Sequence, residues 1–158
     1  MNTSEKTILC LDRDEQNLEL LTLFFRREGF EVETHTSFRA YSKNIGRKDY
    51  AAVILEYFYE ELAVDEICFE FRATLPNVPI IFCSVESRRN KVAKAINAGG
   101  TMYFAKPLDF EKIISAVKEF SGIKNKTEQA AAEMLRRSIT ANALTPKQTT
   151  MRTVKDSF

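Results

Sequence analysis

The chain contains no tryptophan, a single histidine and only three cysteines among its 158 residues. The cysteines, Cys10, Cys68 and Cys83, stand far apart, which argues against both a zinc-binding spacing and a disulfide framework. We therefore expect reduced cysteines that pack as small apolar side chains. The histidine, His35, falls in an edge-like strand that we expect to lie far from the polar residues discussed below. We expect it to be neither a catalytic base nor a metal ligand.

Long apolar runs are also missing. No segment is long enough to span a bilayer, and the polar start MNTSEK lacks the pattern of a signal peptide. We therefore expect a cytoplasmic protein with no membrane partner. The formal net charge of +1 does not suggest a polyanion-binding chain. The charge is uneven, however, because residues 121–158 hold seven basic against three acidic side chains.

Short apolar runs do alternate with segments of helical periodicity. The predicted strands cover residues 7–11, 31–35, 51–55, 79–83 and 101–105. The predicted helices cover residues 15–28, 38–45, 63–75, 92–96 and 110–117, with Gly29 ending the first and Asp109 capping the last. Five strand–helix pairs in strict alternation predict an α/β fold, in which helices cover both faces of a parallel sheet.

The character of the sequence changes after about Gly122. We expect one domain over residues 1–121 and a basic C-terminal extension over 122–158. The extension is predicted to form a helix over about 127–142, followed by a flexible tail. An apolar stripe on this helix favours a docking face against the parent domain over a partner-binding helix; it comprises Ala131, Met134, Leu135 and Ile139.

Polar side chains follow the predicted strands. Asp12, Arg13 and Asp14 come after the first strand, and Glu56 comes after the third. The fourth is followed by Ser84 and Glu86, and the fifth by Lys106 and Pro107. In open α/β sheets the functional crevice lies at the carboxyl ends of the strands. These side chains therefore predict a functional site at that edge.

The order of these strands, helices and polar residues resembles the CheY-like receiver domain of response regulators over about residues 5–121. The segments ILCLDRDEQN, PIIFCSVE and AGGTMYFAKPLDFEKI carry the resemblance. It implies a flavodoxin-like, doubly wound sheet of five parallel strands in the order 2-1-3-4-5. It also implies two-component signalling, in which an aspartate after the third strand accepts a phosphoryl group from a histidine kinase.

The resemblance assigns a role to each polar position. Glu56 occupies the phosphoacceptor position, and Asp12 and Arg13 occupy the acidic pair that helps to hold a divalent metal. Lys106 matches the lysine that contacts the phosphoryl oxygens, and the Lys106–Pro107 bond is a candidate cis peptide. The switch hydroxyl and the switch aromatic correspond to Ser84 and Tyr103.

At two of these positions the residue differs from the family's usual one, and both differences affect metal binding or phosphoryl transfer. Arg13 places a permanent cation near the metal position, so we expect no bound cofactor. Asp12 and Asp14 remain candidate Mg²⁺ ligands only if Arg13 turns out of the pocket. Glu56 carries its carboxylate one carbon–carbon bond farther out, about 1.5 Å, which displaces it from in-line transfer geometry. In addition, the loop YFYEELAV lacks the proline and glycine usual in the family.

These departures favour an atypical pseudo-receiver that is not an enzyme and acts as a phosphorylation-independent adaptor. Its predicted partner surface, for a signalling protein or a second copy, is the fourth helix, fifth strand and fifth helix, around residues 91–118. Glu56 is then either a fixed substitute for phosphoaspartate or an inert residue, and Arg13 pairs with Glu56 or Asp12 or is solvated. The alternatives are a phosphoacceptor receiver and, ranked last, a nucleic-acid or anionic-surface binder that uses the basic tail.

Overall fold

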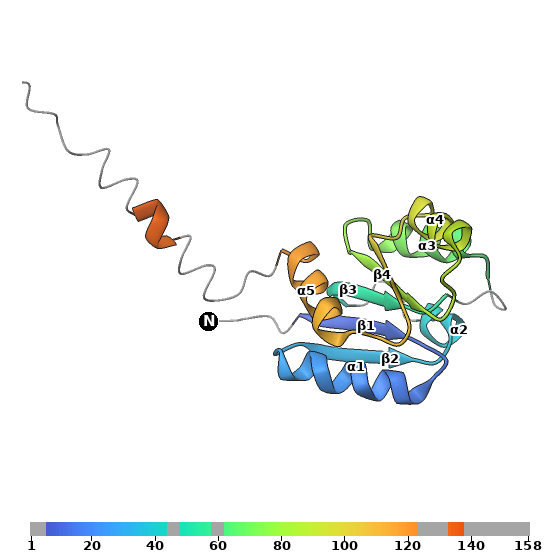
Figure 1. The fold of residues 1–158 in the computed structure, drawn as a ribbon, viewed down its shortest axis with the longest axis horizontal. Helices are drawn as coiled ribbons and strands as arrows, with labels where there is room; N and C mark the ends of the chain where they lie inside the picture. Colours follow the sequence, from blue (N-terminus) through green and yellow to red (C-terminus); the bar gives the residue numbers. More distant parts are fainter. Residues whose placement is uncertain (1–5, 44–47, 58–61, 123–132, 138–158) are drawn as a thin grey trace, which may run out of the picture. The chain divides into compact units, whose positions relative to one another are not determined.

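A computed structural model describes residues 6–43, 48–57, 62–122 and 133–137. Five strands form one parallel sheet in the order β2-β1-β3-β4-β5, which confirms the predicted fold (Figure 1). The strands are β1 (Thr7–Leu11), β2 (Glu31–His35), β3 (Tyr50–Leu55), β4 (Ile80–Ser84) and β5 (Met102–Ala105). The helices are α1 (Glu15–Arg27), α2 (Phe38–Ser42), α3 (Val64–Thr74), α4 (Arg89–Asn97) and α5 (Phe110–Phe120).

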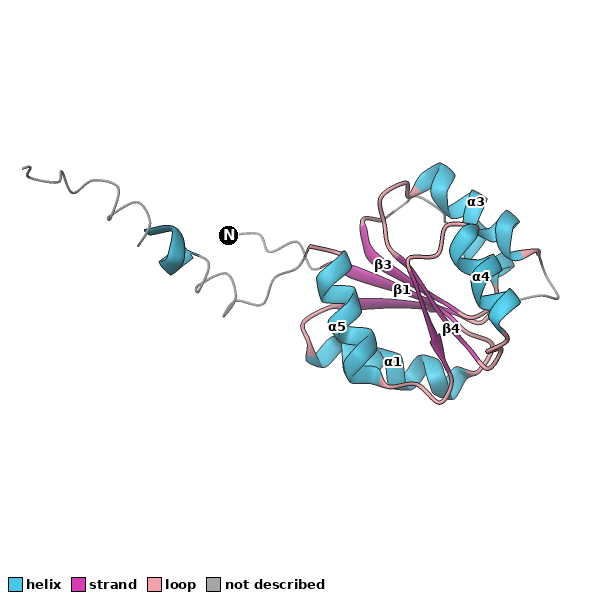
Figure 2. Ribbon diagram, turned by 45° about the horizontal axis from the view of Figure 1, so that its top comes forward, coloured by secondary structure: helices cyan, strands magenta, loops and turns pink. Residues whose placement is uncertain are grey.

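The helices cover the sheet from both faces, as the continuous apolar runs of the inner strands predict (Figure 2). Every residue of β3 and β4 is buried. On one face, Leu18, Leu21 and Phe25 of α1 join Ile113 and Val117 of α5 in a single hydrophobic cluster. The opposite face is covered by apolar side chains of α2, α3 and α4. The outer strands β2 and β5 are only partly buried, so the two edges of the sheet remain accessible.

Local sequence signals set the ends of the helices, and the first turns of α1 and α5 lie beside the polar edge of the sheet. The Asp14 carboxylate accepts a hydrogen bond from the Gln16 backbone N–H at 2.9 Å and caps α1. Asp109 caps α5 as predicted, because its carboxylate accepts from the Lys112 N–H at 3.2 Å. Such caps stabilise a helix by about 1 kcal/mol each. Gly29 follows α1 with a φ of 85°, a backbone angle that favours glycine.

Arg72 and Gly100 hold α3 and α4 against the sheet. The Arg72 guanidinium donates to the backbone oxygens of Val78 at 2.6 Å and Gly99 at 2.8 Å. A methyl group on Gly100 would lie 2.8 Å from the Phe82 ring, too close for a real contact. The turn between α4 and β5 is therefore packed closely against Phe82 of β4.

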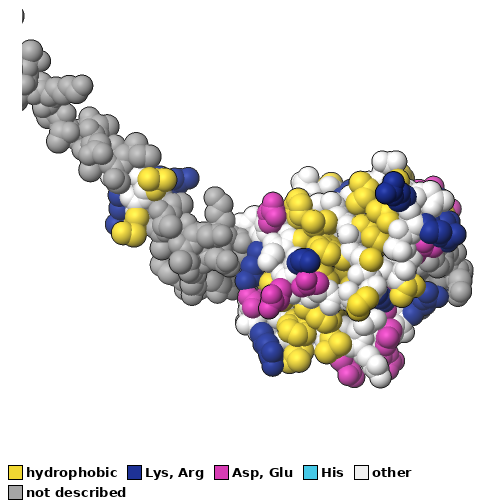
Figure 3. Space-filling model, viewed as in Figure 1, with side chains coloured by type: hydrophobic (Ala, Val, Ile, Leu, Met, Phe, Trp, Pro, Cys, Tyr) yellow, Lys and Arg dark blue, Asp and Glu magenta, His cyan; other side chains and the backbone are white. Residues whose placement is uncertain are grey.

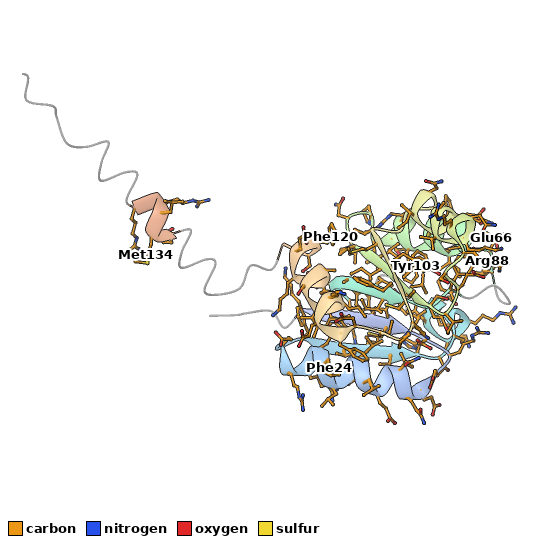
Figure 4. The ribbon with its side chains drawn as sticks, in the orientation of Figure 1. Phe24, Glu66, Arg88, Tyr103, Phe120 and Met134 are labelled. Carbon is orange, nitrogen blue, oxygen red and sulfur yellow. The ribbon has the colours of Figure 1, made fainter. Side chains whose placement is uncertain are left out.

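The chain divides into two units, residues 1–123 and 124–158. In the second unit, residues 133–137 are helical, and the side chains of Met134 and Leu135 are exposed (Figure 4). The rest of the predicted 127–142 helix, including Ala131 and Ile139, lies outside the described residues. Among the residues that are described, no helix is both long and apolar enough to cross a membrane.

Candidate functional site at the carboxyl edge of the sheet

Parallel strands bring the predicted polar residues to one edge of the sheet. The strand ends are tied together by backbone hydrogen bonds: the Glu56 N–H donates to the Leu11 oxygen at 2.8 Å, and the Lys106 N–H donates to the Ser84 oxygen at 2.9 Å. Asp12, Glu56 and Ser84 are buried although each is polar. A buried carboxylate is stable only when charges or hydrogen bonds compensate it, so the partners of these groups define the site.

Lys106 supplies the compensating cation. Its Nζ lies 2.7 Å from Asp12 Oδ2 and 3.1 Å from Glu56 Oε1, so a single ammonium group bridges both carboxylates. All three side chains are largely withdrawn from solvent, with exposed fractions of 11% for Lys106, 3% for Asp12 and 7% for Glu56. Low solvent access strengthens charge-assisted hydrogen bonds of this kind.

Arg13 contacts the second carboxylate oxygen of Glu56. The Arg13 backbone N–H donates to Glu56 Oε2 at 3.1 Å, and its Nε approaches the same oxygen at 3.4 Å. The Arg13 side chain is 44% exposed, which places the guanidinium at the rim of the site. Of the two carboxylates considered in the sequence analysis, the structure pairs this arginine with Glu56. Both carboxylate oxygens of Glu56 are therefore engaged by donors.

The electrostatics of the site follow from this arrangement. Burial raises the pKa of Glu56, but the Arg13 N–H and Lys106 together lower it below its usual value. Burial also raises the pKa of Asp12, and the hydrogen bonds from Lys106 and the Asp14 N–H offset only part of that rise. For Lys106, burial lowers the pKa, but the bonds to Asp12 and Glu56 more than reverse the effect, so its pKa is raised. Glu56 and Lys106 thus stabilise each other in their charged forms.

The remaining acid of the cluster is turned outward. Asp14 is exposed and caps α1, and the Asn17 side-chain amide lies 3.4 Å from Asp14 Oδ2 and 3.5 Å from Asp12 Oδ2. Asn17 was not singled out in the sequence analysis. Its place three residues after Asp14, in the first turn of a predicted helix, is the signal that could have identified it.

Ser84 and Tyr103 are both attached to the loop between β4 and α4. Ser84 Oγ accepts from the Glu86 N–H at 3.2 Å, and the Tyr103 hydroxyl donates to the Glu86 backbone oxygen. The Tyr103 ring stacks on Phe82 with the ring centres 5.9 Å apart. Arg88 hydrogen-bonds to the Glu86 carboxylate and lowers the pKa of Glu86 to about 2. Glu86 was expected at this edge, but its contacts with both switch positions were not predicted.

His35 requires a correction. This residue was expected to lie far from the polar site, yet the Asp12 N–H donates to the His35 backbone oxygen at 3.2 Å. The reason is the parallel pairing of β1 with β2, which sets Leu11 opposite His35. Its imidazole does turn away, since Nε2 lies 2.8 Å from Glu33 Oε1. The Lys106–Pro107 peptide, a candidate cis bond from sequence, is cis.

The donors present at this edge do not fit a magnesium ion. Mg²⁺ requires near-octahedral oxygen ligation and is bound through carboxylates that remain free to coordinate it. Here Asp12 and Glu56 share the Lys106 ammonium, and the Arg13 side chain adds a second cation. Across the described part of the chain, no group of three or more histidine, cysteine, aspartate or glutamate side chains could hold a metal.

Solved structures with the same fold include a CheY-like receiver domain protein from Methanospirillum hungatei. It is 20% identical with a TM-score of 0.69, and the match covers 75% of this chain and 95% of that one. Another is the receiver domain of the sensor histidine kinase PA1611 from Pseudomonas aeruginosa, which contains a magnesium ion in its active-site cleft. It is 20% identical with a TM-score of 0.66, over 75% of this chain and 99% of that one. At these identities the likeness shows the fold alone.

The sequence comparisons concern the same region. The response regulator protein TmoT of Ectopseudomonas mendocina is 28% identical over 118 residues, which is 75% of this chain and 54% of that protein. The chain thus spans about half the length of the curated relatives it matches first. Residues 8–118 match the model of the response regulator receiver domain. That match covers well over half of the chain, and the chain therefore belongs to the response regulator receiver domain family.

Proposed function

We propose that this receiver domain works as a phosphorylation-independent adaptor in cytoplasmic two-component signalling, and not as an enzyme. One observation carries the proposal: both carboxylate oxygens of Glu56 are engaged, Oε1 by Lys106 at 3.1 Å and Oε2 by the Arg13 N–H at 3.1 Å. A carboxylate that must attack a phosphoryl donor needs a free oxygen and a cation placed for the incoming charge. Here the cations already neutralise the glutamate itself.

The chemistry of phosphoryl transfer supports the same conclusion. Transfer depends on positioning and on neutralisation of the developing charge, much of which a metal ion supplies. Arg13 introduces a cation where the family places an acid, and so opposes metal binding. The longer side chain of Glu56 carries its carboxylate to Lys106 without any added group. In an ordinary family member the phosphoryl oxygens of a phosphoaspartate would lie at this position beside the lysine, which favours a fixed signalling state over an inert residue.

The partner surface in this proposal is formed by α4, β5 and α5, around residues 91–118. The edge strand β5 leaves Met102 partly exposed, and Ile96 of α4 is exposed to a similar degree. An open groove of about 430 Å³ runs between β5 and α5 and is lined in part by Met102, Phe104 and Lys112. Apolar side chains with a charged border are typical of protein interfaces.

Magnesium with beryllofluoride, a non-covalent phosphoryl mimic, tests the proposal directly. The reagent is titrated into the labelled full chain while the backbone amide signals around Glu56 are followed. We expect no saturable, magnesium-dependent shift. The matched control is the Glu56→Asp, Arg13→Asp double variant, in which the acidic pocket is restored and such shifts are expected. Saturable shifts in the unmodified chain would end the proposal.

A phosphoacceptor receiver is the second candidate function. It is favoured by the contact of 2.7 Å between Lys106 and Asp12, two positions that match the family, and by the half-exposed Arg13 side chain. This candidate predicts that a phosphorylated histidine kinase transfers label to the chain and that Glu56→Ala abolishes the transfer. No label with several kinases, alongside labelling of the double variant, would reject it.

A further inference from the structure

Helix α1 carries an ordered distribution of exposed side chains. Glu15 and Glu19 are exposed in its first turns, and Arg26 and Arg27 are exposed in its last turn. Between them lies Leu23, whose side chain is 46% exposed, with Leu20 nearby at 42%. In the space-filling view, the lower rim of the domain shows acidic groups at one end of this helix, basic groups at the other and hydrophobic groups between them (Figure 3).

Leu23 and the four charged side chains also line an open groove between α1 and the edge strand β2. The groove has a volume of about 860 Å³, and its α1 wall includes Leu18, Leu23 and the four charged residues. Thr34, His35 and Ala40 form part of the opposite wall. Leu23 gives this groove an exposed apolar side chain between its acidic and basic borders, and an apolar centre with a charged rim is an arrangement that protein interfaces use.

We infer that this groove binds a second copy of the same chain, with the two α1 helices side by side and antiparallel. The charge pattern is complementary to itself. A two-fold axis near the middle of the helix sets Glu15 and Glu19 of one copy opposite Arg26 and Arg27 of the other, and the reverse at the far end. Leu23 of each copy then lies near the centre. A closed, self-complementary contact of this type is the commonest form of homo-oligomer interface.

The geometry of the helix supports separate interactions at the two ends. With a rise of 1.5 Å per residue, the acidic and basic pairs lie about 14 Å apart along the axis. This exceeds the Debye length of about 8 Å at physiological ionic strength, so the charges within one helix scarcely neutralise each other. The charges at each end therefore remain available to a partner.

The charge order has a second, local effect that the test must separate. Acids at the start of a helix and bases at its end also stabilise the helix dipole. That effect explains the charges but not the exposed leucines or the groove beside them. The helix-dipole effect does not change with protein concentration, whereas the extent of self-association does.

The test is sedimentation velocity on the full chain with two charge-reversal variants, Glu15→Lys with Glu19→Lys and Arg26→Glu with Arg27→Glu. The unmodified chain should show a reversible dimer that weakens as salt is added. In a homodimer of either variant, like charges lie opposite each other at both ends of the α1 contact. We therefore expect the association constant to fall at least about tenfold. An equimolar mixture of the two variants restores opposite charges at both ends and should recover the dimer.

Circular dichroism and thermal melting establish that each variant is folded. Leu23→Gln, which changes an exposed side chain, should weaken association with no loss of fold. An unmodified chain that stays monomeric up to about 1 mM would overturn the inference. So would a dimer that survives both charge reversals but is lost in Met102→Asp, because association would then use the β5 edge. The inference does not depend on whether Glu56 can be phosphorylated.

Discussion

The carboxyl edge of the sheet and the outer surface of α1 use the same kinds of charged side chain for opposite purposes. At the sheet edge, Asp12, Glu56 and Lys106 are withdrawn from water and satisfy one another. On α1, Glu15, Glu19 and Arg27 remain in solvent. Buried charges are costly to leave unpaired and therefore fix local structure, whereas exposed charges contribute little to stability and instead select partners. The predictions below test this contrast, starting from the largest expected effect.

Lys106→Met should be the most destabilising change. Removing the cation leaves two buried carboxylates uncompensated, which costs about 3–5 kcal/mol of unfolding free energy near pH 7. Burial already raises the pKa of Asp12 in the parent, and loss of Lys106 raises it further, so the folded state of the variant binds more protons at Asp12 and its stability should increase as the pH falls. Urea unfolding at pH 7 and pH 5 measures both effects. Equal stability of variant and parent at pH 7 would show that the lysine is not needed to compensate these acids.

Glu56→Gln should have an intermediate effect. The amide keeps the shape but loses the charge that Arg13 and Lys106 recognise, which costs about 1.5–3 kcal/mol at neutral pH. The pKa of Glu56 is lowered in the folded protein, so its contribution is complete above the unfolded-state pKa near 4.5 and disappears as the pH falls through the folded-state value. The stability difference between parent and variant should therefore close in acid. Glu15→Gln, on the exposed surface, provides the matched control.

Arg13→Ala should change stability by only about 0–1 kcal/mol, because its half-exposed side chain is screened by solvent. The backbone N–H that donates to Glu56 Oε2 is retained in this variant. Chemical denaturation at low and high salt measures the difference, which should shrink as salt is added. A loss comparable to that of Lys106→Met would mean that the arginine is part of the buried cluster and not of its rim.

Glu19→Gln should have the smallest effect on the monomer, within about 0.5 kcal/mol, as is usual for exposed positions. Its measurable consequence should be weaker self-association and a shallower salt dependence, because one charge at each end of the α1 contact is removed. Dilute samples give the monomer stability, and concentrated samples followed by sedimentation give the association. A stability loss above this limit would assign Glu19 a structural role within the domain.

Much of the fold follows from local patterns. The spacing of apolar residues predicts the order of strands and helices, and Asp109 and Gly29 mark helix ends as expected. The polar edge could also be predicted, because parallel strands end on the same side whatever their exact packing. The contacts of Arg72 with Val78 and Gly99 could not, since they join segments whose proximity depends on the packing of α3 and α4.

By itself, the sequence determined that this chain is an α/β receiver domain with a glutamate and an arginine at positions where the family has acids. Periodicity and residue order are local properties of the sequence. Because the strands of a parallel sheet all end on the same side, the polar residues that follow them must meet at one edge. Only the tertiary structure decided which carboxylate Arg13 contacts, that Lys106 bridges Asp12 and Glu56, and that the charges of α1 border an open groove. Those outcomes depend on side-chain conformations and on the approach of distant segments, which no local pattern encodes.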